Sequence, residues 1–514
     1  MKKVHFLKVL RVLLAILVFT PILLFFVDFT GKSPLWLHRL MHFQFIPSLL
    51  GGMYGIMAVL LLLTFLFGRI YCSVICPAGV LQDIINRIYC IGKKKKNGIW
   101  RFRYHKPQNW LRYTLLAVTG ITIAFGSIEL CLLLDPYSNF GRIAGNLFRP
   151  LVILGNNLIA DGLAKTGNYS LYHESVRIAT PALIAASVAI VVFIVFSVWR
   201  GRLFCNTLCP VGALLSLFSR FSLMRIAVDK SLCNHCLTCE RSCKAEAINS
   251  KEAKIDMSRC VGCFNCLSSC KQNALTCRPF FVADKTESAA TPESHKPNSR
   301  REFIATSAAI AVAAPAAMLK AQNEQADAEK RQPVTPPGSL SLEHFKDKCT
   351  ACHLCVTHCP SHVLRPAGLA YGFDYLLKPQ MSYVDSYCNY ECVICSEVCP
   401  LGAIRPLTVE EKKTTQIGVA QFFEDICVVK VKEQDCGACS EHCPTQAVHM
   451  VPYKGTLTIP KVEPELCVGC GGCESICPVR PDRAIIIKAH PVHRTVEKIK
   501  EEKALDVEIN EFGF

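Results

Sequence analysis

The chain has 514 residues, of which 51% are hydrophobic and only 19% are charged, and its mean hydropathy is +0.28. These values predict that part of the chain lies in a membrane, and the length suffices for two to four domains. The formal net charge of +16 would suit a nucleic-acid-binding protein, but much of the lysine and arginine stands beside apolar stretches, which argues against that class.

Four apolar stretches are long enough to cross a bilayer, which takes about 20 residues. They are residues 9–27, 45–67, 110–134 and 179–199. The loop over residues 68–108 contains KKKKNG and has Asp83 as its only acid, whereas the connecting loops around residues 30–42 and 135–176 are far less basic. By the positive-inside rule, we expect the amino terminus and this loop on the cytoplasmic side.

An internal repeat follows the second and fourth stretches. It reads GRIYCSVICPAG over residues 68–79 and GRLFCNTLCPVG over residues 201–212. Two similar hairpins predict a pseudo-symmetric four-helix bundle that brings the paired cysteines of both loops to one site. These cysteines are Cys72, Cys76, Cys205 and Cys209. The site would hold a metal or an additional cluster, or cycle between dithiol and disulfide, unless the cysteines are incidental at helix ends.

Two cysteine runs with the spacing C-x2-C-x2-C-x3-C come next. They are Cys233, Cys236, Cys239, Cys243 and Cys260, Cys263, Cys266, Cys270. In two-cluster ferredoxins three cysteines of such a run reach one [4Fe–4S] cluster, and the fourth turns to the other cluster. We therefore expect Cys270 to complete the first cluster and Cys243 the second. Zinc is the weaker alternative for eight cysteines in two such runs.

The carboxy-terminal third contains four more runs, each ending in Cys-Pro. They are Cys349, Cys352, Cys355, Cys359; Cys388, Cys392, Cys395, Cys399; Cys427, Cys436, Cys439, Cys443; and Cys467, Cys470, Cys473, Cys477. The spacers suit strand hairpins, so we pair the first run with the second and the third with the fourth, although a nested pairing stays open. Because of the long gap between Cys427 and Cys436, Cys427 is the ligand that the spacing defines least well. Six clusters would bring about −12 charges, which removes the argument for nucleic acid.

The segment between the two halves reads as an export signal. Residues 281–299 form a polar linker, and residues 300–320 begin with the twin arginines Arg300 and Arg301 before an Ala-rich stretch. This twin-arginine pattern predicts a fifth crossing that would place the last four runs in the periplasm. The alternatives are an Ala-rich soluble helix or a linker that leaves every cluster in the cytoplasm.

The predicted fold is an α-helical membrane bundle with α+β ferredoxin-like [4Fe–4S] modules. The membrane domain, with four spans, covers residues 1–215, and the two-cluster domain covers residues 225–280. The four-cluster domain covers residues 340–490. Three cysteines, Cys90, Cys131 and Cys277, fall outside every run and are expected to be structural or incidental.

The chain resembles two known families joined end to end. With its four apolar stretches, paired Cys-x3-Cys-Pro loops, the motif LDPYSNFGR and two ferredoxin runs, the part up to residue 280 resembles the NapH membrane ferredoxins. Residues 299–490 resemble the NapG and MauM proteins, which have a twin-arginine leader and four cluster runs. The resemblance implies a bacterial inner-membrane protein that oxidises quinol and passes electrons to a periplasmic reductase or cytochrome, as in nitrate-reductase systems.

The leading hypothesis is therefore an electron-transfer subunit rather than a stand-alone enzyme. Glu129 is the one acid well inside an apolar stretch and is the predicted proton acceptor for quinol, with Asp135 and Arg142 just outside it. Copper reduction or an assembly role through the Cys-x3-Cys-Pro loops is the alternative, since four thiolates suit Cu(I). A third hypothesis is a regulatory scaffold whose clusters sense redox state.

Overall fold

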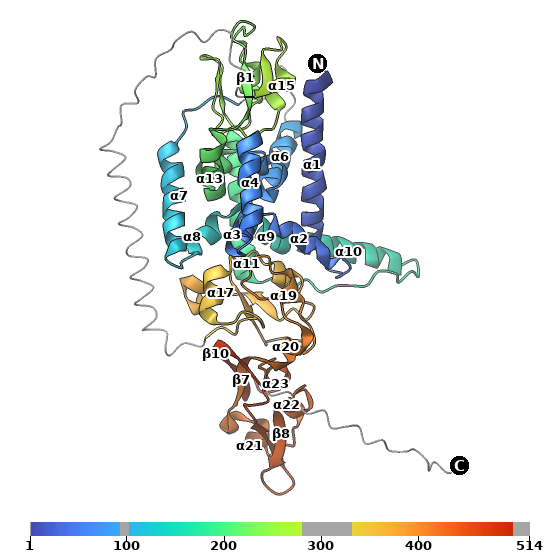
Figure 1. Cartoon of the computed structure of the whole chain (residues 1–514). Coiled ribbons are helices and arrows are strands. Elements are labelled where there is room, and N and C mark those ends of the chain that lie inside the picture. The colour runs from blue at the N-terminus through green and yellow to red at the C-terminus, as the bar shows by residue number, and fades with distance from the viewer. Residues whose placement is uncertain (1, 93–101, 280–331, 497–514) are drawn as a thin grey trace, which may run out of the picture.

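The computed structural model describes residues 2–92, 102–279 and 332–496. A helical bundle occupies the middle of the molecule, and one cysteine-rich part lies at each end of it (Figure 1). The KKKKNG sequence, the polar linker and the twin-arginine segment with its predicted fifth crossing lie outside the described residues.

The long helices of the bundle run roughly along one direction (Figure 1). They are α1 (Lys2–Val27), α4 (Tyr54–Phe67), α6 (Pro77–Gly92), α7 (Asn109–Ala124), α11 (Thr180–Arg200) and α13 (Pro210–Ser219). Short helices close the end opposite the amino terminus, namely η1 (Leu35–His38), α2 (Arg39–His42), α3 (Phe45–Leu50), α8 (Glu129–Leu134) and α9 (Pro136–Ile143). The repeated loops contain α5 (Tyr71–Val74) and α12 (Leu203–Thr207). A proline then starts α6 and α13, because its fixed φ suits a first helical turn.

Within the described ranges, three helices are long and apolar enough to cross a membrane, by length and composition. They are Phe6–Val27, Pro136–Ala164 and Thr180–Arg200. The expectation of continuous helices over residues 45–67 and 110–134 is wrong, because the chain turns at Gly52 and Gly126, which both adopt positive φ. The helix α4 that follows the first turn has only 14 residues, about 21 Å of rise. The predicted count of four or five spans is therefore not supported among the described residues.

The helical segment Pro136–Ala164 was expected to be a connecting loop. It consists of α9, a π-helical turn (η2, Ala144–Phe148) and α10 (Arg149–Ala164). This segment is much less apolar than the other two candidate spans, which is why its pattern is easily missed. Figure 1 shows α9 inside the bundle, whereas α10 projects sideways from it, across the direction of the long helices.

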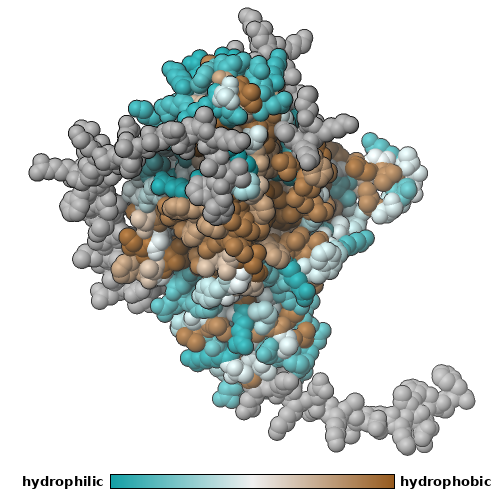
Figure 2. Space-filling view, turned by 45° about the horizontal axis from the view of Figure 1, so that its top comes forward, coloured by the Kyte–Doolittle hydropathy of each residue, from teal (hydrophilic) through white to brown (hydrophobic). Residues whose placement is uncertain are grey.

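On the face shown in Figure 2, a hydrophobic band crosses the bundle between two hydrophilic ends. Large apolar side chains of the bundle, such as Leu17 on α1 and Val188 on α11, are more than half exposed. Soluble monomers rarely show so large an apolar surface, so the band indicates a membrane protein.

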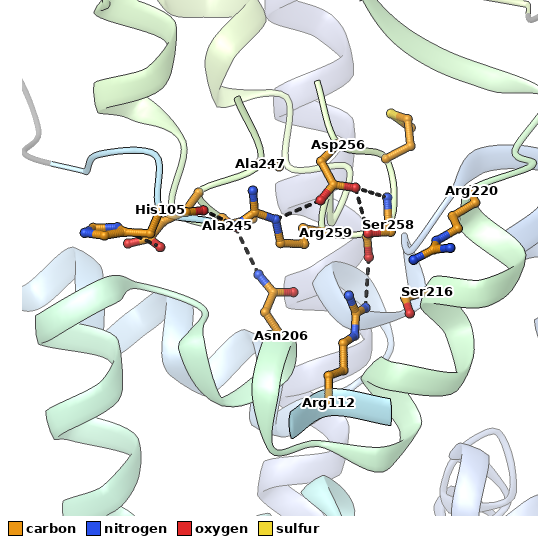
Figure 3. Close-up of polar contacts among 12 residues, drawn as sticks. His105, Arg112, Asn206, Ser216, Arg220, Ala245, Ala247, Asp256, Ser258 and Arg259 are labelled. Atoms are coloured by element: carbon orange, nitrogen blue, oxygen red, sulfur yellow. Dashed lines mark hydrogen bonds and ion pairs between the residues drawn. The ribbon is translucent and has the colours of Figure 1, made fainter. Parts of the chain in front are cut away.

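The first cysteine-rich part is a small α+β unit at the amino-terminal end of the bundle. Its strands are β1 (Met224–Val228) paired with β4 (Leu275–Pro279), and β2 (Ile248–Asn249) paired with β3 (Lys254–Ile255), all antiparallel. Two short helices, α14 (Thr238–Ser242) and α15 (Asn265–Ser269), each contain one cysteine of a run. Figure 3 shows the junction, where the buried Arg112 donates to the carbonyl of Ser258 at 2.9 Å and Arg259 donates to the carbonyl of His105 at 2.9 Å.

The second cysteine-rich part lies at the opposite end of the bundle (Figure 1). Its antiparallel pairs are β5 (Leu364–Pro366) with β6 (Pro379–Met381), β8 (Val448–Pro452) with β9 (Thr458–Val462), and β7 (Thr415–Phe422) with β10 (Ile485–Thr495). Its helices are α17 (Leu342–Lys348), α18 (Leu354–Thr357), α19 (Ile394–Val398), α20 (Val409–Thr414), α21 (Val428–Lys432), α22 (Ala438–Glu441) and α23 (Gly472–Ile476). A strand pair lies between the first two runs and another between the last two, as the spacers suggest.

Candidate redox centres

The two repeated loops bring their four cysteines together inside the bundle. Cys72, Cys76, Cys205 and Cys209 are each at most 4% exposed. Cys209 lies within electrostatic range of the other three, and Cys205 and Cys72 interact with each other. The four-cysteine site predicted from the repeat is therefore present as an arrangement of side chains, although what it holds stays a prediction.

An exchange of arginines holds the two loops together. Arg69 of the first loop donates from Nη2 to the carbonyl oxygen of Cys205 at 2.8 Å, and Arg202 of the second loop donates from Nη1 to that of Cys72 at 2.6 Å. Both guanidinium groups are at most 1% exposed. Buried cations of this kind need fixed acceptors, so each loop supplies the acceptor that orders the other.

One glycine in each loop lets the chain pass close to the backbone carbonyl of the first cysteine in the same loop. A Cβ at Gly79 would stand 2.1 Å from the carbonyl oxygen of Cys72, and one at Gly212 would stand 2.2 Å from that of Cys205. These two carbonyl oxygens also accept the hydrogen bonds from Arg202 and Arg69. The arginine of Gly-Arg and the glycine of Pro-x-Gly in the repeat therefore both position the backbone of the first cysteine in each loop.

The chemistry of the sulfur groups fits clusters better than single ions. Among the described residues, no three His, Cys, Asp or Glu side chains converge as they would around one metal ion. A mononuclear zinc site draws its sulfurs to about 2.3 Å from a single atom, whereas a cubane holds its four ligands at separate corners. Burial also raises the pKa of thiols such as Cys260 and Cys349, each to about 12, so binding iron must displace their protons.

In the first cysteine-rich part, each run places three cysteines near one cysteine of the other run. Cys239 lies within electrostatic range of Cys233 and Cys270, and Cys243 lies within range of Cys263. Cys236 is exposed, so this group is the outer one. The other group adjoins the bundle, since Cys260 is within range of Arg69 in the first repeated loop.

In the second cysteine-rich part, two pairs of runs show the same arrangement, in which three cysteines of one run lie near the fourth cysteine of its partner run. Cys355 lies within range of Cys349, Cys352 and Cys399. The remaining groups are Cys388, Cys392, Cys395 with Cys359; Cys427, Cys436, Cys439 with Cys477; and Cys467, Cys470, Cys473 with Cys443. The arrangement follows the pairing of first run with second and third run with fourth, and not the nested one.

The long gap in the third run is filled by a helical turn. The helix α21 begins directly after Cys427 and ends four residues before Cys436. This detour leaves Cys427 within range of both Cys436 and Cys477. Cys427, the ligand that the spacing defines least well, therefore lies near two of the cysteines with which it would share a cluster.

The four groups of the second part follow one another away from the bundle. Backbone N–H of Cys388 donates to the carbonyl of Cys470 at 3.0 Å, which joins the second group to the one around Cys470. The buried Tyr383 lies within range of both cysteines and donates to the carbonyl of Gly469 at 2.7 Å. The group of Cys427 comes last, since α21 lies toward the far tip (Figure 1).

Helix α9 joins the bundle to the first of these groups. The hydroxyl of Thr350 donates to that of Ser138 at 2.7 Å, and a Cβ at Gly141 would stand 2.4 Å from the carbonyl oxygen of Cys352. Asn146, in the π turn, donates to Nδ1 of His353 at 3.0 Å, and Nε2 of His353 donates to the carbonyl of Leu377 at 2.9 Å. The motif DPYSNFGR is thus a docking surface for a cluster loop.

A short series of buried groups connects the four-cysteine site with this docking surface. Tyr71 lies within electrostatic range of Cys72, of Cys76 and of Asp135. Asp135 in turn lies within range of Cys352. The two cysteine-rich parts are therefore linked through the bundle interior by the four-cysteine site, Tyr71 and α9.

The three residues predicted for quinol chemistry lie at this second end of the bundle. Asp135 caps α9 by accepting from the backbone N–H and hydroxyl of Ser138, at 2.8 and 2.6 Å, and Arg142 donates to the carbonyl of Leu132 at 2.7 Å. Glu129 starts α8 and lies 3.7 Å from Lys378. Asp135 and Arg142 thus have structural partners, and the proton-accepting role of Glu129 stays a prediction.

The sequence analysis did not predict the buried cluster of charged side chains around Asp83 of α6. Asp83 pairs with Arg202 at 2.8 Å, with Lys244 at 2.5 Å and with Arg11. The available signal was its position as the one acid in a basic loop, seven residues after Cys76. The three unassigned cysteines, Cys90, Cys131 and Cys277, lie in α6, α8 and β4.

Three family models describe parts of this chain. A 4Fe-4S binding domain matches residues 49–97 and again residues 180–228, so it covers both repeated loops. A 4Fe-4S dicluster domain matches residues 434–480, and another matches residues 256–363. The last match joins two runs that the structure places at opposite ends of the bundle, so it reports cysteine spacing rather than one compact unit. No solved structure is significantly similar to the chain.

The similar curated proteins are ferredoxin-type proteins. MauM of Methylobacillus flagellatus is 32% identical over 150 residues, 28% of this chain and 63% of that protein, so the chain spans less than two thirds of it. NapG of Escherichia coli is 27% identical over 198 residues, 37% of this chain and 84% of that protein. MauM of Methylophilus methylotrophus is 30% identical over 202 residues, 38% of this chain and 88% of that protein. The predicted likeness to NapG and MauM is confirmed, and the chain belongs to the MauM family of ferredoxin-type proteins.

Proposed function

We propose that the protein is a membrane electron-transfer subunit that carries electrons from the quinol pool to a periplasmic reductase or cytochrome. The observation that supports it best is the continuous series of cysteine groups, from the exposed Cys236 through the bundle to the tip near Cys427. The matched 4Fe-4S models and the MauM and NapG relatives agree with an iron–sulfur role.

The proposal includes six [4Fe–4S] clusters in the ferredoxin-like parts and a seventh at the repeated loops. Each repeat alone supplies two cysteines, so one cluster would need both loops. Bound clusters supply one-electron carriers. A quinol releases two electrons and two protons on oxidation, so two oxidised carriers each take one electron, and the protons pass to solvent.

The finer resemblance to NapH for residues 1–280 and the location in a bacterial inner membrane belong to this proposal. The first cysteine-rich part would face the cytoplasm and the second the periplasm, with the hydrophobic band of Figure 2 between them. The alternative of copper reduction would use only the four loop cysteines and would leave six cysteine runs without a purpose.

The test uses anaerobic membranes that contain the full chain. On addition of a soluble quinol analogue, electron paramagnetic resonance should show reduced [4Fe–4S] signals in the wild type and in the control Cys277→Ser, which changes a cysteine outside every group. The variant Cys352→Ser should keep the signals of the first part and lose transfer to a periplasmic acceptor. Wild-type clusters that dithionite reduces and quinol does not would overturn the proposal.

A further inference from the structure

A cavity of about 660 Å³ lies between α1, α6 and the first cysteine-rich part. Its size is within the range of small-molecule sites, which run from about 300 to 1,000 Å³. Apolar side chains form one end, and three of them, Leu13, Ile16 and Ile88, are more than half exposed within the hydrophobic band. The cavity therefore reaches the surface that would face lipid tails.

The other end of the cavity is charged and buried. Arg11, Asp83 and Lys244 line it, and both cations pair with the carboxylate of Asp83. Arg11 is only 8% exposed, and its Nε has no hydrogen-bond partner among the residues that the structure describes. A buried N–H without an acceptor is costly, so this donor indicates a missing polar partner at the site.

This charged end stands between two of the cysteine groups. Lys244 directly follows Cys243, which belongs to the inner group of the first cysteine-rich part. On the other side, Asp83 accepts from Nε of Arg202 at 2.8 Å, and Arg202 donates to the carbonyl of Cys72 at 2.6 Å. A molecule held here would have candidate electron carriers on two sides.

We propose that this cavity is the binding site for the headgroup of a quinol or quinone. The inference rests on the proposed function and adds where the lipid-soluble substrate binds. The ring would occupy the apolar part, and its oxygens would meet Nε of Arg11 as donor and Asp83 as acceptor. A hydroxyl of the quinol can donate to the carboxylate, and a carbonyl of the quinone can accept from the guanidinium, so both redox forms find a partner.

The position of the charged end, between two cysteine groups, favours a redox-active occupant over a phospholipid headgroup. The lining cations Lys8, Arg11, Arg87 and Lys244 would also attract a phosphate, so displacement by quinone is part of the test. A ring with two neutral oxygens suits this mixed donor and acceptor set. Its tail would leave along the apolar face between α1 and α6.

The experiment compares two neighbouring tryptophan variants on α1 in membranes that contain the full chain. Ile16→Trp narrows the cavity, whereas Leu17→Trp, at a position 69% exposed and outside the cavity lining, is the matched control. We expect Ile16→Trp to require about tenfold more quinol analogue for half-maximal cluster reduction. Leu17→Trp should match the wild type, and dithionite should reduce the clusters fully in all three proteins. Arg11→Gln, which removes the Nε donor, should weaken quinone binding in the same assay.

A photoreactive azidoquinone gives an independent readout, and we expect it to label peptides of α1 or α6. Equal half-maximal concentrations for Ile16→Trp and Leu17→Trp, or labelling beside Glu129 at the other end, would overturn this site while leaving quinol oxidation intact. A bound phospholipid that quinone does not displace would also overturn it. If quinol fails to reduce wild-type clusters, the proposed function itself fails.

Discussion

At the scale of single residues, the four-cysteine site depends on groups that carry no sulfur. Arg69 and Arg202 fix the carbonyls of Cys205 and Cys72, and glycines leave room for this contact. The sequence repeat predicted that the cysteines would meet. It did not assign a task to the arginines, because a contact between residues 130 or more positions apart leaves no local pattern.

We predict that Gly212→Ala removes about four iron atoms per chain, the content of one cluster. The added Cβ would stand 2.2 Å from the carbonyl oxygen of Cys205, so the loop must shift and its cysteines with it. Gly120→Ala, in a helix where a Cβ meets nothing within 4 Å, should keep the full iron content. The measurement is the iron content of each purified variant. Equal iron in both variants would argue against a cluster at this site.

At the scale of elements, the sequence was most informative where spacing alone sets geometry. The exchange of the fourth cysteine between runs follows from ligand spacing and reappears in the structure. Helix boundaries were harder to predict, because Gly52 and Gly126 divide apolar stretches whose hydropathy is continuous. Helix α10 was missed, because polar residues such as Asn156 and Asn157 dilute its apolar pattern.

We predict that Gly141→Val uncouples the bundle from the second cysteine-rich part. The new side chain would meet the carbonyl of Cys352 and the ring of Phe26, so α9 cannot keep its close approach to this loop. Quinol should still reduce signals of the first part, but electron delivery to a periplasmic acceptor should fall at least about tenfold, the effect of 1.4 kcal/mol. Gly155→Val, on α10 with open space around it, is the control. Normal delivery by Gly141→Val would show that this contact is not needed.

At the scale of the whole molecule, the structure places its cysteine groups in an order that the sequence could not supply. The four runs of the second cysteine-rich part are evenly spaced along the chain. The last run nevertheless lies nearer the bundle than the third, because Cys388 contacts the loop of Cys470. The two ends of the bundle also carry different parts (Figure 1). Such order depends on long-range packing of short elements.

We predict that iron removal unfolds both cysteine-rich parts and spares the bundle. Their sheets are two-stranded pairs, which are marginal alone, and binding of metal is coupled to folding at such sites. After anaerobic chelation in detergent, circular dichroism should keep most of its helical signal, while protease should cut both parts and leave a helical core. Resistance of these parts to protease without iron would contradict this expectation.

We predict that alkaline phosphatase fused after Phe514 is active, since that enzyme folds in the periplasm. The two cysteine-rich parts lie on opposite sides of the hydrophobic band, so the chain should end on the side away from its amino terminus. Replacing both Arg300 and Arg301 with lysine should abolish this activity if the export pattern is used. A fusion that is active only as a cytoplasmic reporter would place all cysteine groups inside the cell.

The exchange of arginines between the two loops has a consequence for how the protein can vary. Two identical subunits related by a two-fold axis make contacts of this kind, in which the arginine of each binds the cysteine carbonyl of the other. A substitution at Arg69 therefore disturbs the loop of the other repeat, and the same holds for Arg202. Neither half of the bundle is free to diverge alone, and natural variants should keep or lose these two arginines together.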